Sequence, residues 1–498
     1  MKTKKIALNF ISDVLPLIII SFLGIYKMKL FIQILGDETL GLYQLFSQIM
    51  VYVSLVDGGL SSAVLYSLYK PNAKGDNKKL KSILAGAYKC FSLIGIIVFS
   101  IAFVCSFFVK GFIKGCSFSY SYIVITFLLF AISNTIGYFF VPYNCLLEVK
   151  EKRYINNLIV QGGQIVLSIS EIIMLLLHVR FEYILVMHGI VKLITNLTEM
   201  FICKKMYPDI KLTQKDKSYE FKKKIKPLVF HKINGLIGSN IDTLIISSFM
   251  GLKSVAIYST YNYIINMLKK ILGKIEYSMT AIVGNSIALK NNNTYDIFME
   301  INSMLFYIAI VICVPLNYAI NGFINIWYEN TISTSYLISI AFIAILFIFI
   351  VKMATTLFVS SGGLYDETKF CALTDTIVNL VLSLTLVHYL GISGVLIATA
   401  ISVFIAEYIM KTIVIHKNIF KISPKKYFTK NIKFFLIYFV DLFISYFIFS
   451  NINITNIGTW FIVFAIFTIV NGLIILLIFK LMNEIKFIDR FKSLLKGH

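Results

Sequence analysis

The chain of 498 residues lacks the short motifs that mark most soluble enzymes. It contains neither a G-x-x-x-x-G-K-[ST] loop nor a dinucleotide-binding glycine pattern, so nucleotide hydrolysis is not indicated. No H-E-x-x-H pair occurs and the six histidines are scattered, which argues against a metal site. No Asp-x-Asp pair is present, and no predicted outer loop is long enough for a catalytic domain. We therefore expect a transporter, with no catalytic residue, metal or cofactor.

Charged residues are scarce and unevenly divided by sign. They make up 14% of the chain, and 47 lysines and arginines outnumber 25 acids to give a formal net charge of +22. A balance this basic is found in nucleic-acid-binding proteins, but here the basic residues fall in loops between apolar runs. We therefore expect no nucleic-acid partner.

The cysteines give no indication of a disulfide framework. The seven cysteines are odd in number, and no two of them form a C-x-x-C pair. We interpret them as reduced, apolar side chains and not as disulfide partners.

Hydrophobic residues are abundant, at 58% of the chain with a mean hydropathy of +0.81. A soluble protein could not bury that much apolar surface, so the composition predicts an all-α polytopic membrane protein. A bilayer core is crossed by about 20 apolar residues in a helix. The sequence predicts fourteen such spans, at residues 8–35, 41–66, 84–109, 120–141, 154–178, 181–203, 227–250, 255–286, 299–320, 332–360, 371–389, 393–415, 431–450 and 459–481.

The loops between the spans predict the orientation in the membrane. If the N-terminus is inside, the inner segments hold about 32 of the 47 basic residues and the outer loops hold about four. This imbalance predicts that both termini are cytoplasmic. The longest loop, 204–226, carries nine lysines against three acids and is expected to be solvated near anionic lipid.

An internal repeat suggests the domain organisation. Two related segments, 26–43 and 241–258, lie 215 residues apart, and a second pair of landmarks lies 217 residues apart. Such repeats are common in transporters. The matched residues are Gly36 with Gly251, Tyr43 with Tyr258, Leu147 with Leu364, and Lys152 with Lys369. We predict two pseudo-symmetric six-helix lobes and two appended helices, with bounds 1–203 for the first lobe, 204–226 for a basic cytoplasmic linker, 227–415 for the second lobe and 416–498 for the last two helices and tail.

Several predicted spans contain helix-breaking residues. Gly58-Gly59 interrupts the second span and Pro16 and Pro315 lie within the first and ninth. Pro142 ends the fourth span and Pro227 begins the seventh. Within a membrane, broken helices are tolerated where protein or a wet cavity covers the freed backbone groups. Ordinary kinks of membrane helices are the alternative interpretation for each position.

Ionisable side chains at membrane depth carry most of the functional information. Each costs roughly 2.5–3.5 kcal/mol on insertion scales, so each requires a partner or water. Six lysines stand against two acids, and a net-positive hydrated cavity that binds an anion would resolve the imbalance. We therefore predict a set of lysines that binds an anion such as the phosphate of a substrate, namely Lys27, Lys29, Lys269, Lys270, Lys274 and Lys352, accompanied by Asp242 and Glu276 as ion-pair or coupling residues.

Alternatives remain for several of these residues. Lys29 and Lys274 could extend to the membrane surface on their flexible stems instead. Asp242 could pair with a lysine such as Lys27, or it could bind a proton or cation that drives transport. The remaining acids in spans are expected to make helix contacts or to pair at the inner edge; they are Glu171, Glu199, Asp375 and Glu407.

The motifs resemble a known membrane protein family. Asn240-Ile-Asp242, Gly251 and Ala256-Ile-Tyr258 resemble the bacterial polysaccharide flippases of the O-antigen and capsule type. Further resemblance lies in Leu35-Gly36 with Leu40-Gly41-Leu42-Tyr43, in Val56-Asp57-Gly58-Gly59-Leu60, and in Leu390-Gly391 with Gly394-Val-Leu-Ile-Ala398-Thr. That family belongs to the multidrug/oligosaccharidyl-lipid/polysaccharide exporter superfamily.

The resemblance implies a function and a location. It implies two lobes around a central cavity, alternating access, and an undecaprenyl-pyrophosphate-linked oligosaccharide as substrate for surface polysaccharide synthesis. It implies the bacterial cytoplasmic membrane, polysaccharide-assembly proteins such as a polymerase as partners, and a proton or sodium gradient as a candidate energy source. Three alternatives are a multidrug cation antiporter, a lipid II flippase and, in another class, a membrane-embedded glycosyltransferase or polymerase.

Overall fold

The computed structural model describes residues 2–210, 212, 216–221, 241–288, 293–449 and 456–486, with side chains from Leu15 onward except at 275, 277, 278, 281, 282, 288 and 449. The described residues form helices and connecting turns, with no strand among them. The chain divides into two compact units, Met1–Ala256 and Ile257–His498.

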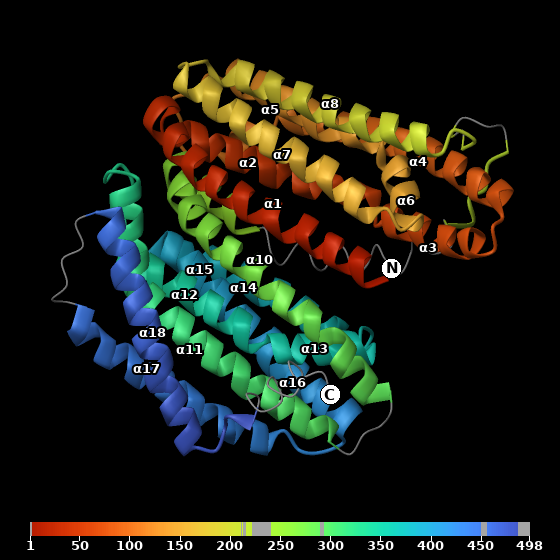
Figure 1. The fold of residues 1–498 in the computed structure, drawn as a ribbon. Coiled ribbons are helices and arrows are strands. Elements are labelled where there is room, and N and C mark those ends of the chain that lie inside the picture. Colours follow the sequence, from red (N-terminus) through yellow and green to blue (C-terminus); the bar gives the residue numbers. More distant parts are fainter. Residues whose placement is uncertain are drawn as a thin grey trace. The chain divides into compact units, whose positions relative to one another are not determined.

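The first unit is a bundle of long helices joined by short turns. Its helices α1, α7 and α8 pack side by side, and α5 packs against α8 (Figure 1). The helices are α1 (Lys2–Leu30), η1 (Phe31–Leu35), α2 (Asp37–Val53), η2 (Ser54–Asp57), α3 (Leu60–Ala73), α4 (Asn77–Ser106), η3 (Val109–Phe112), α5 (Tyr120–Thr135), η4 (Ile136–Phe139), α6 (Val141–Val149), α7 (Arg153–Leu176), α8 (Phe181–Met206) and the helical segment Ile241–Met250.

The second unit has the same character and adds a pair of C-terminal helices. Within it, α14 packs along α15, and α11 packs against both α17 and α18 (Figure 1). The helices are α10 (Leu252–Ala288), whose first residues belong to the first unit, α11 (Thr294–Trp327), α12 (Tyr336–Val351), α13 (Met353–Gly362), α14 (Lys369–Leu390), α15 (Ile392–Val403), η6 (Phe404–Met410), α16 (Lys411–Ile415), η7 (His416–Phe420), α17 (Lys425–Phe449) and α18 (Ile457–Leu481).

Twelve helices among the described residues are long and apolar enough to cross a membrane. They coincide with twelve of the predicted spans, so the prediction of a polytopic all-α membrane protein is confirmed. The count of fourteen is not confirmed. The predicted span 227–250 lies outside the described residues up to position 240, and α10 is not among the twelve. Lys269, Lys270, Lys274 and Glu276 interrupt the apolar character of α10.

The predicted break at Gly58-Gly59 is present. Gly58 and Gly59 adopt left-handed conformations, with φ of 54° and 77°, between η2 and α3. L-residues rarely adopt such φ values, whereas glycine does so without a steric penalty. Pro142 stands at the start of α6, and Pro16 and Pro315 lie inside α1 and α11. Pro227 is outside the described residues.

The paired glycines of the internal repeat share one local geometry. Gly36 has φ of 85° and Gly251 has φ of 87°, and each directly precedes a helix, α2 or α10. At Gly251 an added Cβ would lie 2.6 Å from the carbonyl oxygen of Lys114, so the chain passes too closely for any side chain. The two matched segments therefore share a turn geometry as well as similar residues.

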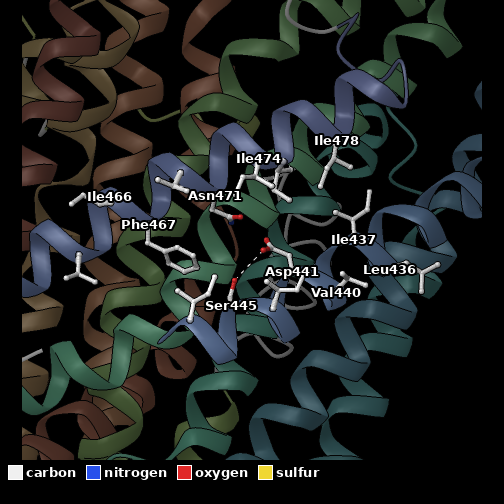
Figure 2. Close-up of a pocket in the computed structure, with 15 residues that line it drawn as sticks. Leu436, Ile437, Val440, Asp441, Ser445, Ile466, Phe467, Asn471, Ile474 and Ile478 are labelled. Carbon is white, nitrogen blue, oxygen red and sulfur yellow. Dashed lines mark hydrogen bonds between the residues drawn. The ribbon is translucent and has the colours of Figure 1, made fainter. Parts of the chain in front are cut away.

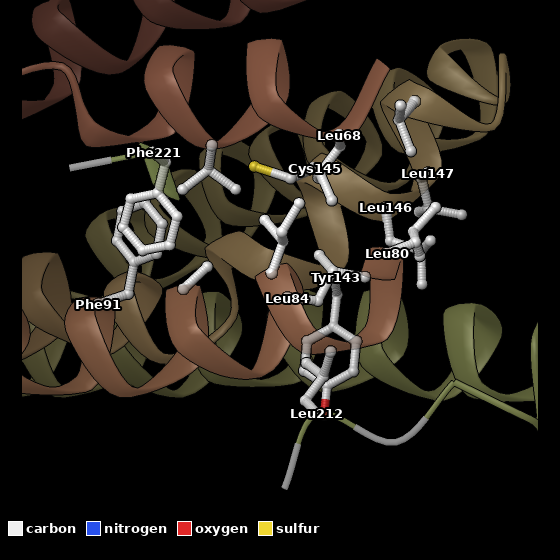
Figure 3. Packing of buried hydrophobic residues seen from close by; sticks show 14 of the residues in the cluster. Leu68, Leu80, Leu84, Phe91, Tyr143, Cys145, Leu146, Leu147, Leu212 and Phe221 are labelled. Carbon is white, nitrogen blue, oxygen red and sulfur yellow. The ribbon is translucent and has the colours of Figure 1, made fainter. Parts of the chain in front are cut away.

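Apolar packing fixes the end of the first unit at which α3, α4 and α6 meet. Leu68, Leu84 and Phe91 are fully buried in this cluster, together with Cys145 and Phe221 (Figure 3). Cys145 is buried and reduced, as predicted for the cysteines in general. Burying each large apolar side chain contributes about 1.5–3 kcal/mol, so this cluster holds the helix ends together.

Candidate functional site

The first unit contains a buried ion pair that the sequence did not predict. Lys27 Nζ, near the end of α1, lies 2.7 Å from Glu171 Oε2 on α7. The Glu171 side chain is 1% exposed and that of Lys27 is 18% exposed. Because α1 and α7 pack along each other, residues 144 positions apart meet inside the bundle. Two charges removed from water are stable there only as partners.

Further polar groups surround this pair. His188 Nδ1 on α8 lies 3.9 Å from Glu171 Oε1, and Lys192, one turn further along α8, donates to Asn134 Oδ1 at 2.9 Å. Lys27 Nζ also lies 5.9 Å from the ring centroid of Tyr43. Helices α1, α2, α5, α7 and α8 thus all contribute to one polar cluster, which we call the first-unit cluster.

Lys29 and Asp242 also belong to the first unit. Lys29 is half-buried at the end of α1, two residues beyond Lys27. Asp242 is buried near the start of the helical segment Ile241–Met250. That segment is fixed at its other end, where the amide of Lys114 donates to the carbonyl of Ser247 at 3.0 Å. Asp242 is therefore held inside protein, as an acid at membrane depth requires.

The second unit contains a cluster built around Glu407. Lys352 Nζ lies 3.3 Å and Lys411 Nζ 2.6 Å from the same carboxylate oxygen, Glu407 Oε2. Asp375 on α14 and Glu276 on α10 are within electrostatic reach of both lysines. We call these five residues the second-unit cluster.

The local backbone brings the second-unit cluster together. Lys352 stands where α12 ends and α13 begins, and Glu407 lies in the π-helical segment η6. Short π-helical insertions often mark functional sites, because the extra residue turns side chains out of their regular rows.

The remaining predicted lysines lie on α10. Lys269 is half-buried, with Nζ 5.6 Å from the ring centroid of Phe349. Lys270 and Lys274 are exposed and lie one helical turn apart, so they project from the same face. We call Lys269, Lys270 and Lys274 the α10 lysines. Like charges at this spacing repel each other, which favours an anion or water between them.

The predicted site residues therefore fall into two groups. Lys27, Lys29 and Asp242 lie in the first unit, and the α10 lysines, Glu276 and Lys352 lie in the second. The sequence count of six lysines against two acids left out Glu171 and Glu407, which the structure places against Lys27 and Lys352. The signal was present in the sequence, since both are isolated acids within apolar spans.

No protein-family model and no curated protein sequence matches this chain. Solved structures do share its fold. A match to "Lipid II flippase MurJ, inward closed conformation" covers 95% of this chain and 98% of the flippase, with 18% identity and a TM-score of 0.72.

Structures of MATE transporters are similar over a shorter part of the chain. An inward-facing multidrug resistance MATE family transporter of the MOP superfamily matches 78% of this chain and 92% of its own, with 18% identity and a TM-score of 0.61. An outward-facing one matches 80% and 93%, with 16% identity and a TM-score of 0.54. At such identities the likeness concerns the fold, and it confirms the exporter fold that the sequence resemblance implied.

Proposed function

We propose that this chain is a flippase that moves an undecaprenyl-pyrophosphate-linked oligosaccharide across the bacterial cytoplasmic membrane by alternating access. The extent of the likeness to the lipid II flippase carries the proposal. That match omits 5% of 498 residues, about 25, whereas α17 and α18 contain 25 residues each. It must therefore include part of the C-terminal helix pair. The inward-facing MATE match omits 22%, which is more than both helices contain.

The α10 lysines support an anionic substrate. Lysine binds phosphate as a compact point charge, and two exposed lysines on one helix face favour a shared anion. We assign these three residues the main role in holding the pyrophosphate. Lys27, Lys29 and Lys352 would complete the site, although Lys27 and Lys352 are already paired with carboxylates. The amines of Lys27 and Lys352 can bind phosphate only if the phosphate displaces the carboxylates or contacts the amines together with them.

The proposed cycle keeps the charged group fixed while the protein moves. The pyrophosphate stays on the lysines, the sugars occupy a hydrated cavity, and the apolar tail remains in the bilayer. Alternate opening of the cavity to the two sides then carries the sugars across. Asp242 and Glu276 are the proposed ion-pair or coupling residues, and a proton or sodium gradient is the proposed energy source.

A reconstituted transport assay tests the proposal. Purified protein in liposomes is supplied with a fluorescent polyprenyl-pyrophosphate-linked glycan, and a membrane-impermeant reagent reports the share on each leaflet. Replacing all three α10 lysines by Gln should lower the initial rate at least about tenfold, because charge-assisted hydrogen bonds contribute about 1.5–3 kcal/mol each. The matched control replaces Lys425, Lys426 and Lys433, three exposed lysines of α17, by Gln and should retain the rate. Wild-type protein that leaves the glycan on its original leaflet would refute the proposal.

Organic-cation antiport is the second candidate, favoured by the MATE-like fold. The same liposomes, loaded with a fluorescent organic cation under a proton or sodium gradient, would detect it. Gradient-driven cation efflux without glycan movement would select this candidate. Glycan movement without cation efflux is the result that our proposal predicts.

A further inference from the structure

The C-terminal helix pair contains a cavity large enough for a small organic molecule. It occupies about 570 Å³ between α17 and α18, and most of the side chains that line it are aliphatic (Figure 2). Rim residues such as Val440, Ile466 and Ile474 are exposed. In a membrane-spanning pair the cavity therefore opens towards lipid. Small-molecule sites typically measure 300–1,000 Å³ and combine apolar walls with a few polar groups.

Three polar side chains form the floor of this apolar cavity. Asp441 and Ser445 come from α17 and Asn471 comes from α18, and they face one another (Figure 2). Ser445 Oγ donates to Asp441 Oδ1 at 3.3 Å, and the Asn471 amide lies near the same carboxylate, but no hydrogen bond of ordinary geometry reaches Asp441 Oδ2. Ser445 and Asn471 are only 2% and 3% exposed. The floor thus retains unused hydrogen-bonding capacity in an apolar setting.

No cation of the described residues neutralises Asp441. The ion pairs between described side chains do not include it. Asn471 lies 14 residues after the start of α18 and 10 before its end, which is about 21 Å and 15 Å along the helix. Lipid headgroups at either surface are therefore remote. A carboxylate at this depth is stabilised by a cation that reaches it.

We propose that the cavity between α17 and α18 binds a lipophilic amine. The apolar body of such a ligand would contact the aliphatic walls, and its protonated amine would donate to Asp441 Oδ2. A lipid acyl chain would contact the aliphatic walls but has no hydrogen-bond donor or positive charge for the carboxylate. The proposal is independent of the flippase function.

The test uses photoreactive dodecylamine and the matching dodecanol, with the full-length protein in nanodiscs of zwitterionic lipid. The amine should label peptides of α17 and α18 saturably, and about tenfold more strongly than the alcohol, as one charge-assisted hydrogen bond predicts. Equal labelling by the two probes would overturn the proposal and identify the cavity as a lipid-chain site. This comparison needs no variant, so it holds even where a substitution impairs folding.

Variants then locate the amine. Asp441→Asn should reduce amine labelling to the level of the alcohol, whereas Asp441→Glu, which keeps the charge, should retain most of it. Asp366→Asn removes an exposed carboxylate from the turn before α14 and should leave labelling unchanged. Amine labelling that persists undiminished in a folded Asp441→Asn protein would overturn the assignment.

Discussion

In the first unit, Glu171 lies 2.7 Å from one lysine amine, with His188 at 3.9 Å. In the second unit, Glu407 lies within 3.3 Å of two lysine amines, those of Lys352 and Lys411. Glu171 is almost completely buried, and Glu407 is 13% exposed. Glu171 is thus neutralised by one close lysine, whereas Glu407 would still have a close lysine if one of its two were removed.

This difference shows that the lysines at membrane depth are not equivalent. Lys27 is needed to neutralise a buried charge, so its structural role is large. Lys352 shares its carboxylate with Lys411, so it can be released at lower cost. Lys270 and Lys274 on α10 are exposed, so they have the smallest structural role. We expect stability to follow this order and anion binding to follow the reverse order.

The largest stability effect is expected at Lys27. Replacing Lys27 by Met leaves Glu171 buried without its close cation, which should lower the free energy of unfolding by about 3–5 kcal/mol. Thermal unfolding of the purified protein in detergent measures this loss. The double variant Lys27→Met with Glu171→Leu should recover most of it, because no unpaired charge remains. A single variant as stable as wild type would show that the pair is unimportant.

A smaller effect is expected at Lys352. In Lys352→Met, Lys411 still neutralises Glu407, so the loss should be about 1.5–3 kcal/mol, the value of one charged hydrogen bond. Adding Lys411→Met should cost more than the two single losses combined, since Glu407 then has no close lysine. A double-mutant cycle measures this coupling. Additive losses would contradict the shared-carboxylate arrangement.

The repeated glycines offer a comparison between equivalent turns. Both Gly36→Ala and Gly251→Ala impose a positive φ on alanine, but only at Gly251 does the added Cβ approach a carbonyl oxygen. At Gly36 no atom lies within 4 Å. Gly251→Ala should therefore be less stable than Gly36→Ala by about 1–3 kcal/mol, the usual cost of overpacking. Equal melting temperatures would argue against the close approach.

The smallest effect on stability is expected for the α10 lysines. Replacing the two exposed members, Lys270 and Lys274, by Gln should change the free energy of unfolding by no more than about 0.5 kcal/mol per position, as at other exposed sites. Unfolding in detergent, beside the α17 control triple, checks this. A large loss would mean that these lysines serve the fold and would weaken their proposed role in binding.

Features that depend on local sequence were predictable. The twelve apolar helices follow from hydropathy, and the break at Gly58-Gly59 and the turns at Gly36 and Gly251 follow from the conformational freedom of glycine. These properties depend only on residues that are neighbours in the sequence. They needed no knowledge of which helix faces pack together.

The ion pairs were not predictable for the converse reason. Lys27 and Glu171 are 144 residues apart, and Lys352 and Glu407 are 55 apart. Whether they meet depends on the rotation of each helix and on its neighbours, and no periodic pattern in one span specifies that. Because the packing of the helices was unknown, the sequence count omitted Glu171 and Glu407 and overstated the excess of lysine over acid. Lys27 and Lys352, at least, have carboxylate partners within hydrogen-bond distance.

The central claim is that the α10 lysines hold the pyrophosphate of a lipid-linked substrate, and a direct binding measurement tests it. Native mass spectrometry of the purified protein can compare a polyprenyl pyrophosphate with the matching polyprenol, for wild type, the α10 Gln triple and the α17 control triple. The account predicts that wild type and control prefer the pyrophosphate at least about tenfold and that the α10 triple loses this preference. An unchanged preference in the α10 triple would contradict it.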